Sequence, residues 1–356
     1  MKKTIAFAAG IIFAAAPFFA QNSYSESDLV WKDDFGGNMN LSKGINFGGW
    51  LSQCYHTKEH YDSFINEDDV RRAAGWGFDH IRLPFDSEVV QNPDGTFIEE
   101  GFSRLEKFVG WAEDSGLDVV LDLHKACGYD FNDAGTENGN PLFSSPHLQE
   151  LFVSLWNEVS SRFGGKKNVA FELLNEVVEQ EAAEPWNDLI DRTLSVIRKN
   201  APETPVIYGG IQWNSARTLR LLRKPEFRNV IFTFHFYEPL IFTHQKAPWV
   251  PGMSPDREIK YPDTDGNLPG IELMRQMIGE ACAAAENAGV PVYCGEYGVI
   301  DRAPVKGTEA WFADVHKIFR EFGVGHAVWT YKEMDFGLTE SHYDGIRASL
   351  IKMMTE

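Results

Sequence analysis

Two glutamates stand where apolar runs of the sequence end. Glu176 closes the segment FELLNE at 171–176, and Glu296 closes the segment VYCGE at 292–296. Two carboxyl groups facing one cleft can cleave a glycosidic bond, because one protonates the leaving oxygen while the other attacks the anomeric carbon or activates water. Each glutamate alone could merely cap a following helix. Their equivalent positions at the ends of two apolar runs favour a catalytic pair.

Other polar and aromatic side chains occupy similar positions. They are Asn175 beside Glu176, Arg82 in IRLP, His124 at the end of LDLH, His235 and Tyr237 in FHFY, and Trp329 in AVWT. A buried arginine is costly unless it is paired, so we expect Arg82 to contact an active-site carboxylate. A single histidine of this kind is more often a hydrogen-bonded core residue, but several such residues at strand ends together predict one polar site.

Short apolar runs alternate with amphipathic segments from residue 44 onward. The runs predict eight strands, at 44–47, 80–83, 119–123, 169–174, 206–208, 230–236, 292–295 and 327–330. The amphipathic segments predict helices at 67–74, 102–115, 148–163, 186–199, 271–288 and 308–322. This alternation predicts parallel strands with right-handed crossovers, and eight repeats in one domain favour a closed (β/α)8 TIM barrel over an open Rossmann sheet. The segment GINFGG at 44–49 also lacks the dinucleotide-binding spacing.

The connection from Glu238 to Pro269 is long and rich in proline and aromatic residues, and a loop of this size in a compact domain is usually functional. Trp249 lies in this connection, while Trp50 and Trp213 lie in other segments that we expect at the same face of the barrel. Their indole rings could stack on sugar rings, with ordinary packing as the alternative. We expect Trp249 and Trp50 to bind substrate.

The chain is strongly acidic, with a formal net charge of −19 at pH 7. Such a field repels phosphate backbones and anionic lipid surfaces, so we expect neither nucleic acid nor a membrane as a partner. A neutral polymer such as a β-linked polysaccharide is not repelled. No apolar run reaches the ~20 residues that a membrane-spanning helix needs. We expect a monomer.

The first twenty residues have the pattern of a signal peptide. Lys2 and Lys3 precede an apolar stretch, and small residues lead to Ala20, with Ala16 as an alternative cleavage point. We therefore expect a secreted or periplasmic protein. Residues 21–40 are polar and aperiodic and predict an N-terminal arm, and residues 41–356 then form the (β/α)8 catalytic domain.

Four cysteines are too few for a disulfide scaffold, and none is spaced as a paired zinc motif. Export would permit a disulfide. Cys54 and Cys127 are a candidate pair because both follow early strands.

One short motif suggests a different class of enzyme. The segment HTKEH at 56–60 matches the inverted zinc-protease pattern, in which His56 and His60 would bind zinc from one helix face beside Glu59. Short patterns of this kind arise easily by chance, and the segment that follows does not continue as a long buried helix. The zinc metalloprotease is therefore the weaker hypothesis.

Taken together, the motifs resemble glycoside hydrolase family 5, and particularly the clostridial-type single-domain endoglucanases. The resemblance covers residues 43–352 and is carried by GINFGGWL at 44–51, FDHIRLPF at 78–85, LDLH at 121–124, AFELLNE at 170–176, FHFY at 234–237, FTHQKA at 242–247 and CGEYGV at 294–299. It implies a (β/α)8 barrel that needs no cofactor and no metal, and a retaining endo-β-1,4-glucanase acting on cellulose or mixed-linkage glucan.

The same resemblance implies a role for each candidate residue. Glu176 would be the general acid and base, Glu296 the nucleophile, and Asn175 the ligand of the sugar 2-hydroxyl. It further implies that Arg82 and Tyr237 keep Glu296 ionised, that His124 and His235 line the cleft, and that Trp329 forms its floor.

Two features depart from the family pattern. Lys125 follows His124 where relatives carry a second histidine, and the sixth connection is shorter than in those relatives. Both affect sugar contacts, so a β-mannanase and an exo-β-glucanase stay open as alternatives. A barrel that binds sugar without cleaving it is disfavoured because both glutamates are present.

Overall fold

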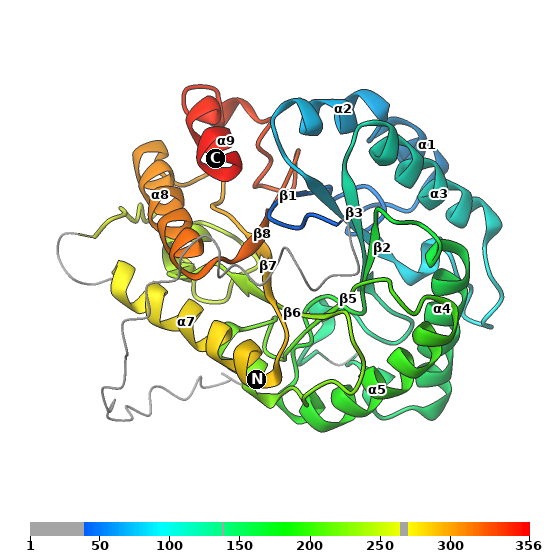
Figure 1. Cartoon of the computed structure of the whole chain (residues 1–356). Helices are drawn as coiled ribbons and strands as arrows, with labels where there is room; N and C mark the ends of the chain where they lie inside the picture. Colours follow the sequence, from blue (N-terminus) through cyan, green and yellow to red (C-terminus); the bar gives the residue numbers. More distant parts are fainter. Residues whose placement is uncertain (1–38, 137–138, 264–269) are drawn as a thin grey trace, which may run out of the picture.

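Eight parallel strands close into a barrel in the computed structural model, which describes residues 39–136, 139–263 and 270–356 (Figure 1). Each strand pairs with its neighbours in sequence, and the last pairs with the first. The strands are β1 (Lys43–Asn46), β2 (His80–Asp86), β3 (Asp118–Lys125), β4 (Val169–Glu172), β5 (Val206–Gly209), β6 (Val230–Phe236), β7 (Val292–Tyr297) and β8 (Gly325–Val328). The predicted (β/α)8 barrel is confirmed. The predicted signal peptide, 1–20, and most of the predicted arm, 21–40, lie outside the described residues.

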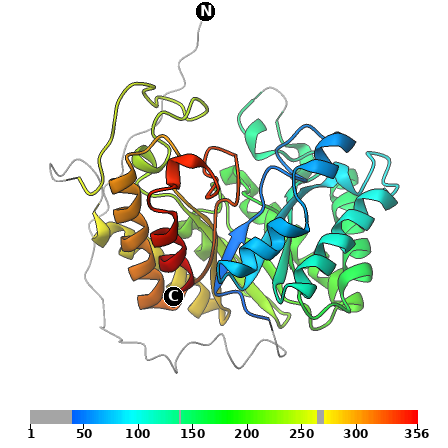
Figure 2. The same cartoon turned by 90° about the horizontal axis from the view of Figure 1, so that it is seen from above.

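Helices surround the barrel and run along its strands (Figures 1 and 2). In the described ranges they are α1 (Lys58–Ser63), α2 (Glu67–Gly75), α3 (Glu99–Asp114), α4 (Pro146–Phe163), α5 (Ala183–Asn200), α6 (Leu240–Thr243), α7 (Ile271–Ala288), α8 (Val305–Phe322) and α9 (Arg347–Thr355). All six predicted helices are present. The additional ones, α1, α6 and α9, are short, so their sequences give little periodicity to detect.

Local sequence explains where several helices begin and end. Asn66 caps α2, and the side chain of Asp69 accepts a hydrogen bond from the backbone N–H of Asn66, which completes a capping box. Ser145 caps α4, whose first residue is proline. Gly289 and Gly323 end α7 and α8 with φ of 73° and 64°, a left-handed conformation that glycine adopts without a steric penalty.

Side chains on the strands β3 to β8 alternate between two apolar clusters. The larger cluster fills the space between the barrel and its helices and includes Ile81, Leu121 and Phe171. The smaller one, which we call the inner apolar layer, consists of Leu41, Val120, Ala170, Ile207, Ile231, Tyr293 and Ala327. Because most of these residues alternate with members of the larger cluster, they point into the barrel. The barrel is therefore packed with side chains and is not a pore.

The four cysteines all lie in the described ranges, and all are free thiols. The predicted pairing of Cys54 with Cys127 is therefore wrong. The Cys54 thiol instead donates to the carbonyl oxygen of Trp50 at 3.2 Å. Across the described ranges we find no helix that combines the length and the apolarity needed to traverse a bilayer.

Candidate active site

A buried arginine organises the upper interior of the barrel. Arg82, on β2, is completely buried. Its Nε and Nη2 donate to both oxygens of Glu172 at 2.7 and 2.9 Å, and its Nη1 donates to Glu296 Oε1 at 2.8 Å. The remaining guanidinium hydrogens reach Asn46 Oδ1 and Asn175 Oδ1, each at 2.9 Å. The predicted contact between Arg82 and an active-site carboxylate is confirmed.

A third carboxylate completes this polar layer, which we define as Asn46, Arg82, Asp122 and Glu172. Asp122 Oδ2 lies 3.1 Å from Arg82 Nη2. Burial alone would lower the pKa of Arg82, but Asp122, Glu172 and Glu296 hold it well above its ordinary value. Burial in turn raises the pKa of Asp122 to about 7. The single guanidinium of Arg82 is therefore shared by three acidic side chains.

The polar layer lies directly above the inner apolar layer. Val120 is in register with Ala170, and Asp122, two residues further along β3, is in register with Glu172 on β4. Because residues two apart on a strand point to the same side, the two layers stack along the barrel axis. The polar layer is the one nearer the carboxyl ends of the strands, where active sites of such barrels lie.

A bulge in β7 turns Glu296 into the barrel. Phe234 is in register with Cys294, but the next residue, His235, is in register with Glu296, so Gly295 is an extra residue. A Cβ on Gly295 would lie 2.9 Å from Thr233 Oγ1 and 3.2 Å from His235 Nε2, so Gly295 also faces inward. Strict alternation would have pointed Glu296 outward. A side chain at 295 would crowd Thr233 and His235, so the glycine keeps this space open.

Two hydrogen-bond donors reach the Glu296 carboxylate. Arg82 Nη1 reaches Oε1, and Tyr237 Oη donates to Oε2 at 3.0 Å. Burial, together with the negative charge of Glu296, raises the pKa of Tyr237 well above its ordinary value, so Tyr237 keeps its proton and stays a donor. Donors of this kind favour the ionised form of a carboxyl group.

Glu176 lies just beyond the end of β4 in a different environment. Its Oε1 is 2.8 Å from His235 Nδ1. Burial raises the pKa of Glu176 to about 7, while the nearby Arg82 guanidinium opposes this rise. Burial also lowers the pKa of His235 to about 4. Near neutral pH the histidine is therefore uncharged, and Glu176 can hold or release a proton.

The two glutamates approach each other closely. One oxygen of Glu176, one oxygen of Glu296 and a ring nitrogen of His235 all lie within 4.8 Å of one another. Retaining glycosidases hold their carboxyl groups about 5–5.5 Å apart, whereas inverting enzymes need about 6.5–9.5 Å. The observed proximity fits the retaining arrangement.

Three further predicted residues are Asn175, His124 and Trp329. Asn175 Nδ2 is buried and has no hydrogen-bond partner among the described residues, although Arg82 fixes the other end of the amide. The rings of His124 and Trp329 stack with centroids 5.7 Å apart and an interplanar angle of 8°. His124 is held by Asp122 Oδ2 at 2.7 Å and by Gln53 at 2.8 Å. The structure thus places Asn175 against Arg82 and stacks His124 on Trp329.

The two remaining predicted tryptophans differ in exposure. Trp249 is 51% exposed, and the Arg302 guanidinium lies 5.9 Å from its ring centroid. Trp50 is only 3% exposed; its ring packs 5.5 Å from that of Phe108, and its Nε1 donates to the Tyr61 carbonyl. The expectation that Trp50 stacks on sugar does not fit this position, because neighbouring side chains already cover its faces. Trp213, also 51% exposed, is better placed.

The sequence argument missed several residues of the site. Asn46, Asp122, Glu172 and Gln53 were not predicted, yet each contacts Arg82 or His124 directly. A signal for two of them was available. Asp122 and Glu172 are single acids inside otherwise apolar strands, and a buried acid, like a buried arginine, needs a partner.

The zinc-protease hypothesis is wrong, because its two histidines do not share a helix face. His56 precedes α1, and its ring faces Asp86 and Glu88. His60 lies within α1, with its Nε2 2.8 Å from the carbonyl oxygen of Gly49 and its ring stacked on Phe64. Within the described ranges, two groups bring three possible metal ligands together, namely His56, Asp86 and Glu88, and Glu176, His235 and Glu296.

A cavity of about 410 Å³ opens beside the cleft at the ends of β2 and β3. Lys125 lines it and forms an ion pair with Asp130 at 2.6 Å. Tyr129 connects this cavity to the glutamates, because its hydroxyl donates to the carbonyl oxygen of Glu176 at 2.9 Å. Lys125, which departs from the family pattern, therefore lines a cavity next to the site.

Comparison with known proteins identifies the family. The profile described as Cellulase (glycosyl hydrolase family 5) matches residues 42–335. Cellodextrinase A of Ruminococcus flavefaciens is 41% identical over 285 residues, which are 80% of this chain and 83% of that protein. Endoglucanase C of Acetivibrio thermocellus is 34% identical over 344 residues, which are 89% of this chain and 98% of that one.

Solved structures of similar fold point to the same family. The crystal structure of endoglucanase Cel5A from Thermotoga maritima superimposes with a TM-score of 0.73 and 25% identity, covering 88% of this chain and 97% of the other. The profile match spans most of the barrel, and relatives above 30% identity extend along nearly their whole length. This chain belongs to the cellulases of glycosyl hydrolase family 5 and is a retaining glycoside hydrolase.

Proposed function

We propose that this chain is an endo-β-1,4-glucanase in which Glu296 is the nucleophile and Glu176 is the general acid and base. The observation that carries the proposal is the difference between the two carboxyl groups. Arg82 and Tyr237 both donate to Glu296, whereas burial raises the pKa of Glu176 to about 7. One carboxylate that two donors hold in place and one carboxyl group with a raised pKa suit a nucleophile and an acid, respectively.

The reaction then takes two steps. Glu296 attacks the anomeric carbon while Glu176 donates its proton to the glycosidic oxygen, which leaves with the departing sugar. A water molecule next attacks the same carbon, Glu176 takes its proton, and the bond to Glu296 breaks. Two inversions at one carbon restore the β configuration.

The other residues of the cleft would hold and orient the sugar. Asn175 Nδ2, buried without a partner among the described residues, is suited to donate to the 2-hydroxyl of the sugar being cleaved. The stacked rings of His124 and Trp329 offer a flat floor beneath it. Exposed Trp249 is a candidate platform for a more distant sugar unit.

The substrate assignment rests on the relatives, whose names are cellodextrinase and endoglucanase. It is tested with purified β-1,4-glucan, mixed-linkage glucan and β-mannan, using Glu296→Gln as the inactive control. We expect a rapid fall in the viscosity of soluble β-1,4-glucan and products of several lengths. Release of a single short product without loss of viscosity would instead show exo attack, and a preference for mannan would make the chain a β-mannanase.

We further propose that residues 1–20 direct export and are removed, which leaves a secreted or periplasmic enzyme. The charged start followed by an apolar stretch supports this. The measurement is N-terminal sequencing of the protein recovered outside the cytoplasm, with Gln21 expected as the first residue. Recovery of the intact chain from the cytoplasm alone would contradict it.

A further inference from the structure

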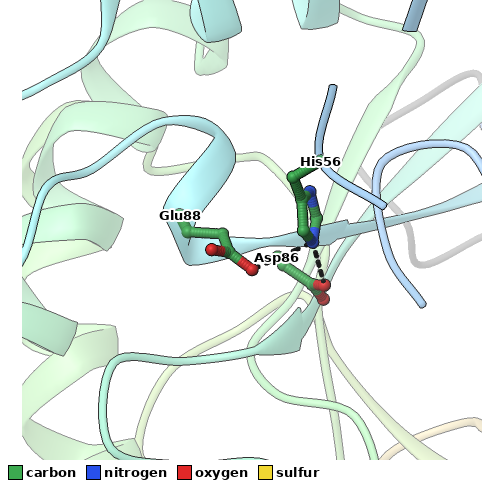
Figure 3. A group of neighbouring side chains, drawn as sticks. All are labelled: His56, Asp86 and Glu88. Atoms are coloured by element: carbon green, nitrogen blue, oxygen red, sulfur yellow. Dashed lines mark hydrogen bonds and ion pairs between the residues drawn. The ribbon is translucent and has the colours of Figure 1, made fainter. Parts of the chain in front are cut away.

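A second group of ligand-type side chains lies at the rim of the barrel. His56 belongs to the segment between β1 and α1, Asp86 ends β2, and Glu88 lies in the short 3-10 helix Ser87–Val89. Figure 3 shows the His56 ring directed at the carboxyl groups of Asp86 and Glu88. The His56 Nε2 atom lies 3.1 Å from Asp86 Oδ2 and 2.9 Å from Glu88 Oε1. We propose that His56, Asp86 and Glu88 bind a divalent transition-metal ion of the Zn²⁺ type.

The spacing of the donor atoms suits such an ion. Zinc binds imidazole nitrogen and carboxylate oxygen at about 2.0–2.2 Å, so atoms that share one ion lie roughly 3 Å apart. The two distances from His56 Nε2 have this size. One nitrogen and two carboxylate oxygens form a borderline ligand set, which favours zinc over magnesium or calcium.

The surroundings of His56 resemble those of a metal ligand. Histidines that bind metals usually donate their second ring N–H to a neighbouring group, which fixes the ring orientation. The other nitrogen of His56, Nδ1, lies 2.5 Å from the hydroxyl of Tyr61. Tyr61 therefore fixes the orientation of the His56 ring, with Nε2 directed at the two carboxylates.

Asp86 supplies an independent observation. Its side chain is only 3% exposed, and its Oδ1 has no hydrogen-bond partner among the described residues. A buried carboxylate oxygen without a partner is costly. An ion bound to this carboxylate, or a water molecule held by that ion, would satisfy it.

The site is also accessible. Asp86 and Glu88 line the cavity of about 410 Å³ beside the cleft, which leaves room for water as the remaining metal ligands. The cation lining that cavity, Lys125, is paired with Asp130 and does not neutralise Asp86 or Glu88. The ion would tie the segment before α1 to the end of β2, and it would share no ligand with the group of Glu176, His235 and Glu296, so we assign it a structural role.

The direct test is calorimetric titration of the chelator-treated full chain with Zn²⁺. We expect one ion to bind, and we expect His56→Gln and Glu88→Gln each to weaken it by at least the roughly 10–100-fold that even second-shell changes cost. His60→Gln is the matched control, because His60 lies nearby but contacts Gly49, and it should leave binding unchanged. Glu296→Gln should also leave it unchanged. Glu88 is 65% exposed, so its variant should fold normally.

A proton on Nε2 is the competing occupant, because the hydrogen bond with Asp86 raises the pKa of His56 to about 10. If the proton alone occupies the site, Zn²⁺ will not bind, or it will bind equally well to Glu88→Gln, and either result overturns the proposal. Loss of binding in Glu296→Gln but not in Glu88→Gln would place the ion at the catalytic pair and overturn it too.

Thermal unfolding and activity separate this inference from the proposed function. Zn²⁺ should raise the unfolding temperature of the wild type but not that of His56→Gln. Hydrolysis of β-1,4-glucan should proceed at the same rate in chelated wild type and in Glu88→Gln. Failure of the glucanase assignment would leave the zinc results intact, and failure of the zinc site would leave hydrolysis intact.

Discussion

The inner apolar layer and the polar layer occupy the same barrel, two residues apart along the strands, and they differ in almost every respect. Ile207 and Ile231 in the first layer are packed hydrocarbon. In the second, fully buried Arg82 pairs with fully buried Asp122 and Glu172, and it also pairs with Glu296. Packed hydrocarbon contributes stability directly, whereas buried ion pairs often stabilise no more than hydrophobic replacements would. The comparison indicates that the inner apolar layer stabilises the barrel, whereas the polar layer positions the groups that act on substrate.

Replacing the nucleophile should give the largest effect. Glu296→Ala removes the proposed nucleophile, so kcat on β-1,4-glucan should fall by roughly 10⁴-fold or more. The fold should survive, because Arg82 keeps Glu172 and Asp122 as partners. Initial rates together with thermal unfolding check both statements. Near-native activity on cello-oligosaccharides would remove Glu296 from its role.

Replacing Arg82, the cation of the polar layer, should have the second largest effect. Arg82→Met leaves Glu172, Asp122 and Glu296 without their shared partner, and breaking a buried pair in this way costs about 3–5 kcal/mol of unfolding free energy. Arg192→Met is the matched control, because Arg192 pairs with exposed Glu150 on the surface. It should cost at most about 1 kcal/mol. Equal losses in denaturant titrations would contradict the special status of Arg82.

A substitution in the inner apolar layer should change the stability of the protein but not its activity. Ile207→Ala creates a cavity in packed hydrocarbon and should lower the unfolding free energy by about 2–5 kcal/mol. Below its unfolding temperature the variant should keep the kcat and KM of the wild type. A large change in kcat with an unchanged unfolding temperature would mean that the two layers do not divide their roles as described.

The pH profile should show the smallest and most graded effect. As the proposed general acid, Glu176 carries a proton in the first step, and burial raises its pKa to about 7. As the pH rises above this value the protonated fraction falls, so kcat/KM should decline by up to about tenfold per pH unit. Initial rates between pH 5 and 9 measure this limb. A flat profile to pH 9 would show that another group donates the proton.

Much of this architecture could be predicted from the sequence. The apolar runs predicted all eight strands, and Glu176, Glu296 and Arg82 were expected together because each stands at or near a strand end. Periodicity is a strong signal for long elements, since burial of one face dictates residue type. The short helices α1 and α6 carry too few residues for this signal.

The errors share a physical cause, which is that burial depends on the tertiary fold. Trp50 was expected to be exposed because loops usually are, yet it packs against Phe108. The segment HTKEH was tested as one helix, but α1 begins at Lys58, after His56. Cys54 and Cys127 follow early strands, but position in sequence does not bring two thiols together. The inward turn of Glu296 was predicted without its cause, the bulge at Gly295.

That bulge constrains how parts of related barrels can be exchanged. A chimera that joins a foreign β7 to this chain must reproduce the bulge along with the sequence. A strand in which Cys294, Gly295 and Glu296 alternated regularly would keep its hydrogen bonds yet deliver its glutamate to the outside of the barrel. Exchange of this strand therefore depends on its local geometry, and a regular strand of the same length would misplace the glutamate while leaving the barrel closed.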